Sequence, residues 1–493
     1  MRTFAATTDN YQPLMAEPTL KHKTTVSLFW SFTDKFGQQL LNFLSMLIMM
    51  NILATEDYGL IGSLAVFIAF SSILVDSGFG RALINRRNLV ASDYSTVFYF
   101  NISLSILLYL TFFFAAPLLG DLFHTQAIIM VIRVMFLSVI FNAFGLIHQT
   151  ILIKNADFKG LTKVNMLSLL IADLVALLMA IAGKGVWALV AQTLVYAFCR
   201  SALLVRYTSW FPNAGFRLTS LKTFFAFSHK LLLTSAISTT INNIYPSLIA
   251  AFYPMSQVAF FNQAKKYQDI PFLTIGNTFK SVSMLILPEI NGESVRLKRV
   301  ISKIIKSVAF LSFPAGCAMI AIAEPTFYLF FKEKWLPAVP YFQILTIAGM
   351  LSPFVHIFNE LFITKENANY FLGIEVIKGV LLILLIVLLF PHGIIALALS
   401  WIIYMFITLL ISLFFSRRLI HYRPVDFLKD TLPYLLTAVA SAALSSFLTQ
   451  QIENNLLYIL LNLSIISLLY LALCKLMRLE MLKEIEQWFR KRK

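Results

Sequence analysis

The sequence of 493 residues has few charged residues for its length. Lysine, arginine, aspartate and glutamate make up 13% of it, and hydrophobic residues make up 59%. A soluble chain carries about a quarter charged residues. So little polar surface would not coat the several soluble domains that a chain of this length could form. Lipid is therefore expected to be the solvent for most of the chain.

Cysteine is scarce, and the motifs of metal and nucleotide chemistry are missing. Cys199, Cys317 and Cys474 lie in apolar segments without CxxC or Cys/His spacing, which argues against disulfides and structural zinc. The seven histidines are scattered and form no HExxH pair. No GxxxxGK loop followed by Ser or Thr occurs for ATP. We therefore expect no cofactor and no metal, and energy from an ion gradient or from consumption of the product.

Apolar runs long enough to span a bilayer recur along the chain. A crossing helix needs about 20 apolar residues, so the sequence predicts an all-α polytopic membrane protein with about 14 transmembrane helices. The predicted spans are 28–53, 58–76, 96–119, 126–150, 161–182, 185–206, 224–252, 258–288, 300–323, 336–364, 368–390, 393–415, 431–449 and 456–476.

The basic residues test this count independently. The net charge of +16 does not indicate nucleic acid, because Lys and Arg lie in short clusters between apolar runs. If the N-terminal segment and every second loop are cytoplasmic, these segments hold 29 of the 40 basic residues, and the opposite loops hold only Lys184, Lys332 and Lys334. The positive-inside rule then places both termini in the cytoplasm. All loops are short, so no separate catalytic domain and no enzyme activity are expected.

The spacing of the spans repeats. The first six and the next six begin 196 to 210 residues apart, and GVWALV at 185–190 resembles GIIALA at 393–398. A repeat in one orientation indicates two halves with a cleft between them, as in many transporters. The predicted segments are a disordered cytoplasmic tail (1–27), two six-helix lobes (28–206 and 224–415), two C-terminal helices (431–476) and a basic cytoplasmic tail (477–493).

Polar residues recur at helical spacing on one face of three spans. Because ionisable groups at bilayer depth are costly, such stripes usually face a cavity or a partner. Local pairing, or snorkelling of lysines to the headgroups, is the alternative. The residues are Ser31, Asp34, Lys35, Gln38, Asn42 and Ser45 in the first span, Ser235, Ser238, Thr239, Asn242 and Pro246 in the seventh, and Asn262, Lys265, Lys266, Asp269, Gly276, Asn277 and Lys280 in the eighth.

Four other charges lie inside predicted spans with weaker patterns. Arg133 is about two turns into the fourth span, within reach of a cavity or of the outer headgroups. Asp173, in the middle of the fifth span, is a candidate group for proton or ion coupling. Glu375 and Lys378 are three residues apart on one helix face and are expected to form a structural pair.

Cations outnumber anions within the spans, which favours an anionic substrate. Ammonium groups suit phosphate oxygens, and the amides and hydroxyls suit sugars. The cations are Lys35, Arg133, Lys230, Lys265, Lys266, Lys280, Lys306 and Lys378, and the anions are Asp34, Asp173, Asp269, Glu360 and Glu375. The predicted substrate-binding residues are Lys265, Lys266, Lys280, Lys35, Asp34, Gln38, Asn42, Arg133, Asn242, Asn262 and Asp269.

Several motifs also resemble those of a known family. They are residues 30–39, LATEDYGL at 53–60, DSGFGRALI at 76–84, DYSTVF at 93–98, GKGVWAL at 183–189 and KWLPAVP at 334–340. From about residue 25 to 415 the chain resembles bacterial polysaccharide flippases of the Wzx type, within the multidrug/oligosaccharidyl-lipid/polysaccharide exporter superfamily. The last two spans carry no such motif.

The resemblance implies a flippase in the bacterial inner membrane that moves an undecaprenyl-diphosphate-linked oligosaccharide to the periplasmic leaflet, for exopolysaccharide, capsule or O-antigen synthesis. It implies two six-helix lobes in a V around a cationic cavity, with alternating access. Its partners would be the lipid-linked oligosaccharide and membrane lipids, together with polysaccharide polymerase and glycosyltransferases. The family has no fixed catalytic motif, so the site residues rest on the polar stripes.

Three other functions are compatible with a polytopic membrane protein. A drug or metabolite antiporter of the same superfamily is less favoured, because cationic drugs suit an acidic cavity. A polysaccharide polymerase or ligase would need a large outside loop with Arg or His, and here the outside loops are short. A scaffold gains no support from the polar stripes.

The charge asymmetry leads to a prediction about topology. A reporter fused after residue 493 should show a cytoplasmic C-terminus, and reporters inserted at 54–57 and at 391–392 should be periplasmic. Alkaline phosphatase and green fluorescent protein fusions measure the two locations. A periplasmic C-terminus would mean that the number of spans is odd.

Overall fold

The computed structural model describes residues 20–76, 78–86, 89–290, 292–364 and 368–492, and every regular element in these ranges is helical. The all-α fold class is confirmed. The α-helices are α1 (Leu20–Ile52), α2 (Thr55–Ser63), α3 (Ala65–Asp76), α4 (Phe79–Asn85), α5 (Ala91–Leu122), α6 (Ala127–Met135), α7 (Leu137–Lys154), α8 (Phe158–Ile181), α9 (Val186–Thr208), α10 (Leu218–Phe252), α11 (Met255–Ile286), α12 (Ser294–Ala321), α13 (Ala323–Phe331), α14 (Val339–Thr364), α15 (Ala368–Leu389), α16 (Ile394–Ile420), α17 (Pro424–Thr449), α18 (Asn455–Leu476) and α19 (Glu480–Arg492). Short 3-10 turns are η1 (Pro288–Ile290), η2 (Glu333–Ala338) and η3 (Phe390–His392).

Each predicted span falls on a helix or on a helix pair, with α2–α3 and α6–α7 supplying one span each. Among the described residues, ten spans are long and apolar enough to cross a membrane, and the bent pair α2–α3 would be an eleventh. The other three are α1, α10 and α11, which carry the polar stripes. The multi-pass architecture is confirmed, whereas the count of fourteen stays a prediction.

The two ends of the chain differ from expectation. Residues 20–27 are the first two turns of α1 and not part of a tail, and the rest of the predicted tail lies outside the described residues. At the other end, α19 is a helix where only a basic tail was predicted. Ion pairs attach α19 to α12: Glu480 lies 2.5 Å from Lys306, and Glu484 lies 2.8 Å from Lys303.

Three helices begin with the same kind of N-terminal cap, formed by an aspartate side chain. Asp57 in α2, Asp93 in α5 and Asp426 in α17 each accept a hydrogen bond from the backbone N–H three residues earlier, at 3.2, 3.2 and 3.0 Å. The first N–H groups of a helix have no partner within the helix, and a negative charge suits this end of its dipole. These aspartates therefore set where α2, α5 and α17 start.

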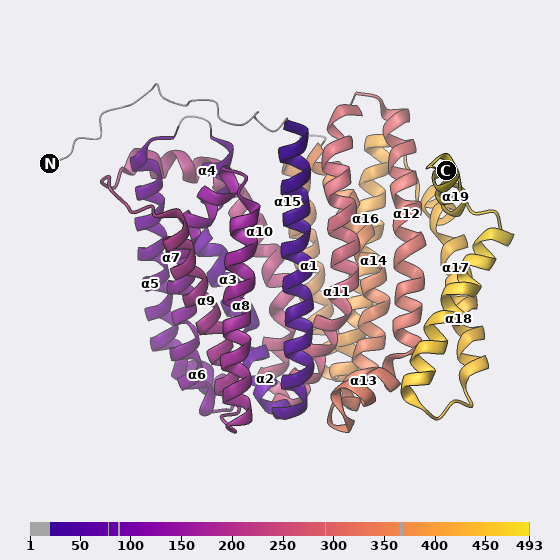
Figure 1. Cartoon of the computed structure of the whole chain (residues 1–493), viewed down its shortest axis with the longest axis horizontal. Coiled ribbons are helices and arrows are strands. Elements are labelled where there is room, and N and C mark those ends of the chain that lie inside the picture. Colours follow the sequence, from indigo (N-terminus) through magenta and orange to yellow (C-terminus); the bar gives the residue numbers. More distant parts are fainter. Residues whose placement is uncertain (1–19, 77, 87–88, 291, 365–367, 493) are drawn as a thin grey trace.

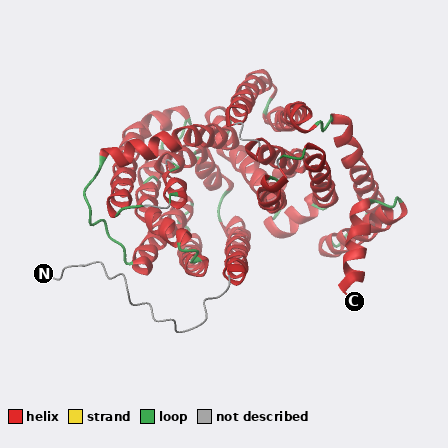
Figure 2. Cartoon of the chain, turned by 90° about the horizontal axis from the view of Figure 1, so that it is seen from above, coloured by secondary structure: helices red, strands yellow, loops and turns green. Residues whose placement is uncertain are grey.

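Equivalent helix pairs pack in both halves of the chain. In the first half α1 packs on α8, and both α7 and α8 pack on α9; in the second half α10 packs on α15, and both α14 and α15 pack on α16. This is the pairing that the predicted repeat gives, although the domain boundaries themselves stay a prediction. The halves lie side by side, with α17–α19 at the outer edge of the second (Figures 1 and 2). They meet where α2 and α3 pack on α10 and α11.

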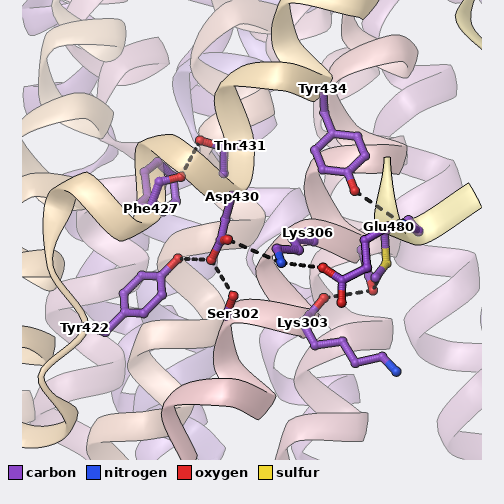
Figure 3. A network of polar contacts seen from close by, with 11 residues as sticks. Ser302, Lys303, Lys306, Tyr422, Phe427, Asp430, Thr431, Tyr434 and Glu480 are labelled. Carbon is purple, nitrogen blue, oxygen red and sulfur yellow. Dashed lines mark hydrogen bonds and ion pairs between the residues drawn. The ribbon is translucent and has the colours of Figure 1, made fainter. Parts of the chain in front are cut away.

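A polar network joins the C-terminal helices to the second half (Figure 3). Asp430 of α17 accepts hydrogen bonds from Tyr422 (2.8 Å) and Ser302 (2.5 Å), and its carboxylate lies 3.5 Å from the ammonium of Lys306 in α12. Lys306 also pairs with Glu480 of α19. Lys306 is therefore a structural cation at this junction, and not one of the charges that line a cleft between the halves.

The network predicts a stability effect at Asp430. Changing Asp430→Ala leaves the Tyr422 hydroxyl and one contact of Lys306 without their acceptor, which should lower the free energy of unfolding by about 2 kcal/mol. Glu293→Ala is the control, because its pair with Arg296 is exposed and should contribute less than about 0.5 kcal/mol. Thermal unfolding in detergent measures both, and equal melting temperatures would contradict the prediction.

Candidate functional site

A polar cavity of about 310 Å³ lies inside the second half. Helices α10, α11, α14, α15 and α16 surround it, so it is built from the elements that pair within this half. It brings together predicted site residues from α10 and α11 with the pair predicted on α15. Its polar lining comprises Ser238, Asn242, Asn243, Lys265, Gln268, Asp269, Ser352, His356, Asn359, Glu375, Lys378 and Thr408, with Trp401 and Tyr404.

The lysines of this cavity are paired with carboxylates. Lys265 lies 3.0 Å from Asp269, one helical turn along α11, and its ammonium stands 5.0 Å from the centre of the Trp401 ring. Lys378 lies 2.7 Å from Glu375, and both residues are only 4% exposed. The local pair predicted on α15 is present. Because an isolated charge at this depth would be very costly, each ammonium carries its own counter-ion.

Lys280, nearer the C-terminal end of α11, is paired as well. It lies 3.1 Å from Glu360 of α14, whose side chain is buried. Lys265, Lys280 and Lys378 therefore each have a carboxylate partner within the second half.

The predicted polar face of α11 is divided among different surroundings. Asn262 packs against Gly62 of α2, so it lies in the contact between the two halves. Lys266 is exposed, and the opposite charge that acts on it is Asp173 of α8. Asp173 also accepts a hydrogen bond of 2.7 Å from Gln192 of α9. The carboxylate that acts on Lys266 therefore belongs to the other half of the molecule.

The polar stripe of α1 is divided in the same way. Asp34 is buried and accepts hydrogen bonds from the Asn165 amide of α8 at 3.1 and 3.3 Å. Lys35 and Asn42 are exposed, and Asn42 donates to the carbonyl of Gln38 on its own helix. Asp34 therefore has a partner on a neighbouring helix, as the sequence allowed, whereas Lys35 and Asn42 are accessible.

Arg200 is a candidate residue that the sequence analysis missed. It lies in α9 and not in a loop, where its guanidinium donates to Asn165 (2.8 Å) and to Gln149 of α7 (2.9 Å). Both acceptors are neutral amides, and Asn165 links Arg200 to Asp34. The signal was present in the sequence, because position 200 falls inside the span predicted at 185–206 although it was counted with the following loop.

Arg200 lines a second polar pocket, of about 410 Å³, in the first half. The pocket lies between α3, α4, α7 and α9. Hydroxyl and amide groups predominate among its polar residues, with Asp76 as the acidic member. These polar residues are Ser72, Asp76, Asn142, Gln149, Thr150 and Arg200. Each half of the molecule therefore holds a polar cavity with at least one cation.

Arg133 does not join either of these cavities. Its guanidinium stands 4.6 Å from the centre of the Phe113 ring of α5, and its Nε is buried without a hydrogen-bond partner in the described part of the structure. It is absent from the lining of both polar cavities described above. A cation–π contact of this kind keeps a charge inside the first half without a carboxylate.

An apolar groove of about 380 Å³ follows the seam between α1 and α11. Phe36, Leu40 and Phe43 of α1 line one side, and Tyr267 and Ile270 of α11 line the other. The rest of the wall comes from α13 and α14 and is mostly phenylalanine. Tyr267 follows Lys266 in the sequence, so α11 presents a charge in one direction and an apolar surface beside it.

Comparison with known proteins decides the family. Residues 48–340, more than half of the chain, match the family model described as polysaccharide biosynthesis protein. The chain belongs to this family. The matched region includes α2, α10, α11 and the motif at 334–340, so it covers most of the elements that surround the polar cavities and the contact between the halves.

Three relatives in this family have names that refer to polysaccharides. The teichuronic acid biosynthesis protein TuaB of Bacillus subtilis is 25% identical over 61% of this chain and 62% of its own length. The succinoglycan biosynthesis transport protein ExoT of Rhizobium meliloti is 23% identical over 68% of each chain. The lipopolysaccharide biosynthesis protein WzxC of Escherichia coli is 22% identical over 75% of each chain.

Solved structures share the fold of this family member. The lipid II flippase MurJ, in an inward closed conformation, aligns with a TM-score of 0.76 at 14% identity over 91% of this chain and 98% of that chain. An inward-facing multidrug resistance transporter of the MATE family aligns with a TM-score of 0.62 at 18% identity, over 78% and 94%. At these identities the likeness establishes the fold alone.

The buried pair of the cavity predicts a non-additive effect on stability. Glu375→Ala alone leaves the Lys378 ammonium buried without its counter-ion and should cost about 3–5 kcal/mol. Glu375→Leu with Lys378→Met removes both charges and should cost much less, since apolar residues of similar volume replace such pairs readily. Unfolding in mixed detergent measures the two variants. A double variant as unstable as the single one would show that the pair contributes in another way.

Proposed function

We propose that the chain is a flippase that moves an undecaprenyl-diphosphate-linked oligosaccharide across the bacterial inner membrane, for exopolysaccharide, capsule or O-antigen synthesis. The names of TuaB, ExoT and WzxC refer to the synthesis or transport of such polymers, and the fold is shared with a lipid II flippase. The observation that carries the proposal is the arrangement of α11, which lies between a charged cavity and an apolar groove.

This arrangement suits a substrate with a long apolar tail and a polar head. The tail of a lipid-linked oligosaccharide would stay in the groove between α1 and α11, where apolar side chains replace lipid at little cost. The diphosphate and the sugars would enter the polar cavities of the two halves, where amides and cations are available. A single helix can thus hold both parts of the substrate during transfer.

The diphosphate needs fixed cations to replace its hydration, because an unpaired charge is costly in a low-dielectric site. Lys266 is an exposed cation of α11 whose charge is acted on by Asp173 of the other half, and Arg200 donates hydrogen bonds to the neutral amides of Asn165 and Gln149. Lys265 and Lys280 would exchange a carboxylate for a phosphate oxygen. Asp269 would then limit how tightly Lys265 retains the phosphate.

Amides of α10 and α1 would serve the sugars. Asn242 lines the cavity of the second half, while Gln38, Asn42 and Lys35 lie along α1. An amide offers both a donor and an acceptor, which matches a sugar hydroxyl. Asn262 and Arg133 are less favoured as direct ligands, because Asn262 packs between the halves and Arg133 contacts Phe113.

Two other functions are less well supported. A multidrug antiporter shares the fold, but drugs of positive charge would meet Lys265 and Arg200 in the polar cavities. A polymerase or ligase would act on the same lipid, yet the relatives whose names state an activity are transport proteins, and not enzymes. We place both termini in the cytoplasm, and we propose a polysaccharide polymerase and glycosyltransferases as functional partners.

The lysines of α11 provide the test. Lys265→Gln, Lys266→Gln and Lys280→Gln should each lower flipping by about tenfold, because a hydrogen bond to a charged group contributes about 1.5–3 kcal/mol. Lys→Arg should be milder, since the charge is kept. The assay uses purified protein in vesicles with a fluorescent undecaprenyl-diphosphate-linked repeat unit, whose exposed fraction is quenched by dithionite.

The control is Lys332→Gln, in the loop between α13 and η2, whose side chain is predicted to be neutral for transport. Protein abundance and melting temperature are measured for every variant, since Lys265→Gln and Lys280→Gln also leave Asp269 or Glu360 unpaired. If the three variants flip at the rate of Lys332→Gln, the lysines pack or snorkel and the substrate takes another route.

A further inference from the structure

The two halves are in backbone contact at one end of the bundle. Gly59 of α2 lies so close to Met255 of α11 that a Cβ at position 59 would stand 1.9 Å from the Met255 carbonyl oxygen. One turn along, a Cβ at Gly62 would stand 3.4 Å from the Cβ of Asn262. At position 59, where the neighbour is backbone, only glycine permits this approach. Figure 1 places α2, α6 and α13 at this end, opposite α4 and α19.

At the same end, the second half caps the last turn of α1. The ammonium of Lys334, in η2, donates to the carbonyls of Asn51 (3.3 Å) and Leu53 (2.7 Å). The indole N–H of Trp335 donates to the carbonyl of Met50 at 3.1 Å. The last carbonyls of a helix have no partner within the helix and form the negative end of its dipole. The cap of α1 is therefore supplied by the other half of the molecule.

Side chains complete this contact. The Asn51 amide donates to the Phe330 carbonyl of α13 at 2.7 Å. Trp335 is fully buried, with its ring 5.5 Å from that of Tyr58 in the first half and 5.9 Å from that of Phe260 in the second. Trp335 thus fills the space where both halves meet. We call Lys334, Trp335 and the carbonyls that they cap the clasp.

We propose that the clasp, together with the contact of α2 with α11, is the outer gate, which must open before the substrate head can leave toward the periplasm. The proposal rests on the proposed function and on the predicted orientation, in which this end is periplasmic. The gate uses hydrogen bonds to backbone carbonyls, which water can replace when the halves separate. Opening this gate therefore breaks hydrogen bonds to backbone carbonyls, and it does not require the separation of a buried ion pair, which would cost more free energy.

The motif at 334–340 then has a mechanical role. KWLPAVP supplies the two donors of the clasp at its start, and the rest of it forms η2 and the first turn of α14. The prolines fix the backbone of this turn without needing an N–H partner. Motion of α14 with the second half would withdraw Lys334 and Trp335 from α1 together.

A disulfide across the halves tests the gate directly. Gly62→Cys and Asn262→Cys are combined in a background of Cys199→Ser, Cys317→Ser and Cys474→Ser. The Cβ separation of 3.4 Å is close to the range of about 3.5–4.5 Å found in disulfides. In vesicles with the fluorescent lipid-linked repeat unit, oxidation should lower flipping at least tenfold, and dithiothreitol should restore it.

Each single-cysteine variant is the matched control and should be insensitive to oxidation. The reduced double variant shows whether the protein folds and works, and mass spectrometry shows the extent of crosslinking. A fully crosslinked protein that flips at the reduced rate would overturn the proposal, because the gate would then not need to open.

A second experiment needs no substrate, so it separates failure of the gate from failure of the proposed function. Ser45→Cys, on α1, is labelled in the same cysteine-free background with a maleimide that does not cross membranes, applied from the periplasmic side. Adding Lys334→Met should raise the labelling rate at least threefold, whereas Lys332→Met, two residues away, should leave it unchanged.

Equal rates in the Lys334 and Lys332 variants would refute the clasp. If labelling and crosslinking behave as expected but neither the parent nor any variant flips the lipid, the gate stands and the proposed substrate fails.

Discussion

Charge in an apolar solvent is the constraint on which this structure depends. A carboxylate or ammonium inside a bilayer needs a partner close by. This structure supplies such partners in several ways. Lys265 and Lys378 have theirs on their own helices, Lys280 has Glu360 on a neighbour, and Lys306 shares Asp430 and Glu480 across three helices. Where no carboxylate is present, amides serve Arg200 and an aromatic ring serves Arg133.

This pairing explains how a molecule can be rich in internal charge and still be able to move. Pairs within one half travel with that half, so they cost nothing when the halves shift. Contacts between the halves are of another kind: they are glycine packing, carbonyl caps and aromatic rings around Trp335. Such contacts can be exchanged for water or lipid at modest cost, which suits surfaces that separate and rejoin.

Much of the fold could be predicted because hydropathy and helical spacing are local properties. The positions of the helices, the multi-pass class and the stripes on α1, α10 and α11 all came from short windows of sequence. The predictions that differ from the structure concern where helices begin and end. Residues 20–27 continue α1, residues 480–492 form a helix, and Arg200 belongs to α9. In the case of α19 the reason is tertiary, since Lys306 and Lys303 provide the partners that hold it in place.

The sequence by itself determined that this protein lies in lipid, that it is helical, and that α11 carries charge at depth, because composition and periodicity are properties of the chain alone. Only the tertiary structure decided what each charge faces. Lys265 and Lys266 are adjacent in sequence, yet Lys265 pairs with Asp269 in the second half, whereas Lys266 is exposed and is acted on by the charge of Asp173 in the first. Adjacent residues on a helix point about 100° apart, and which helix stands in each direction is set by packing.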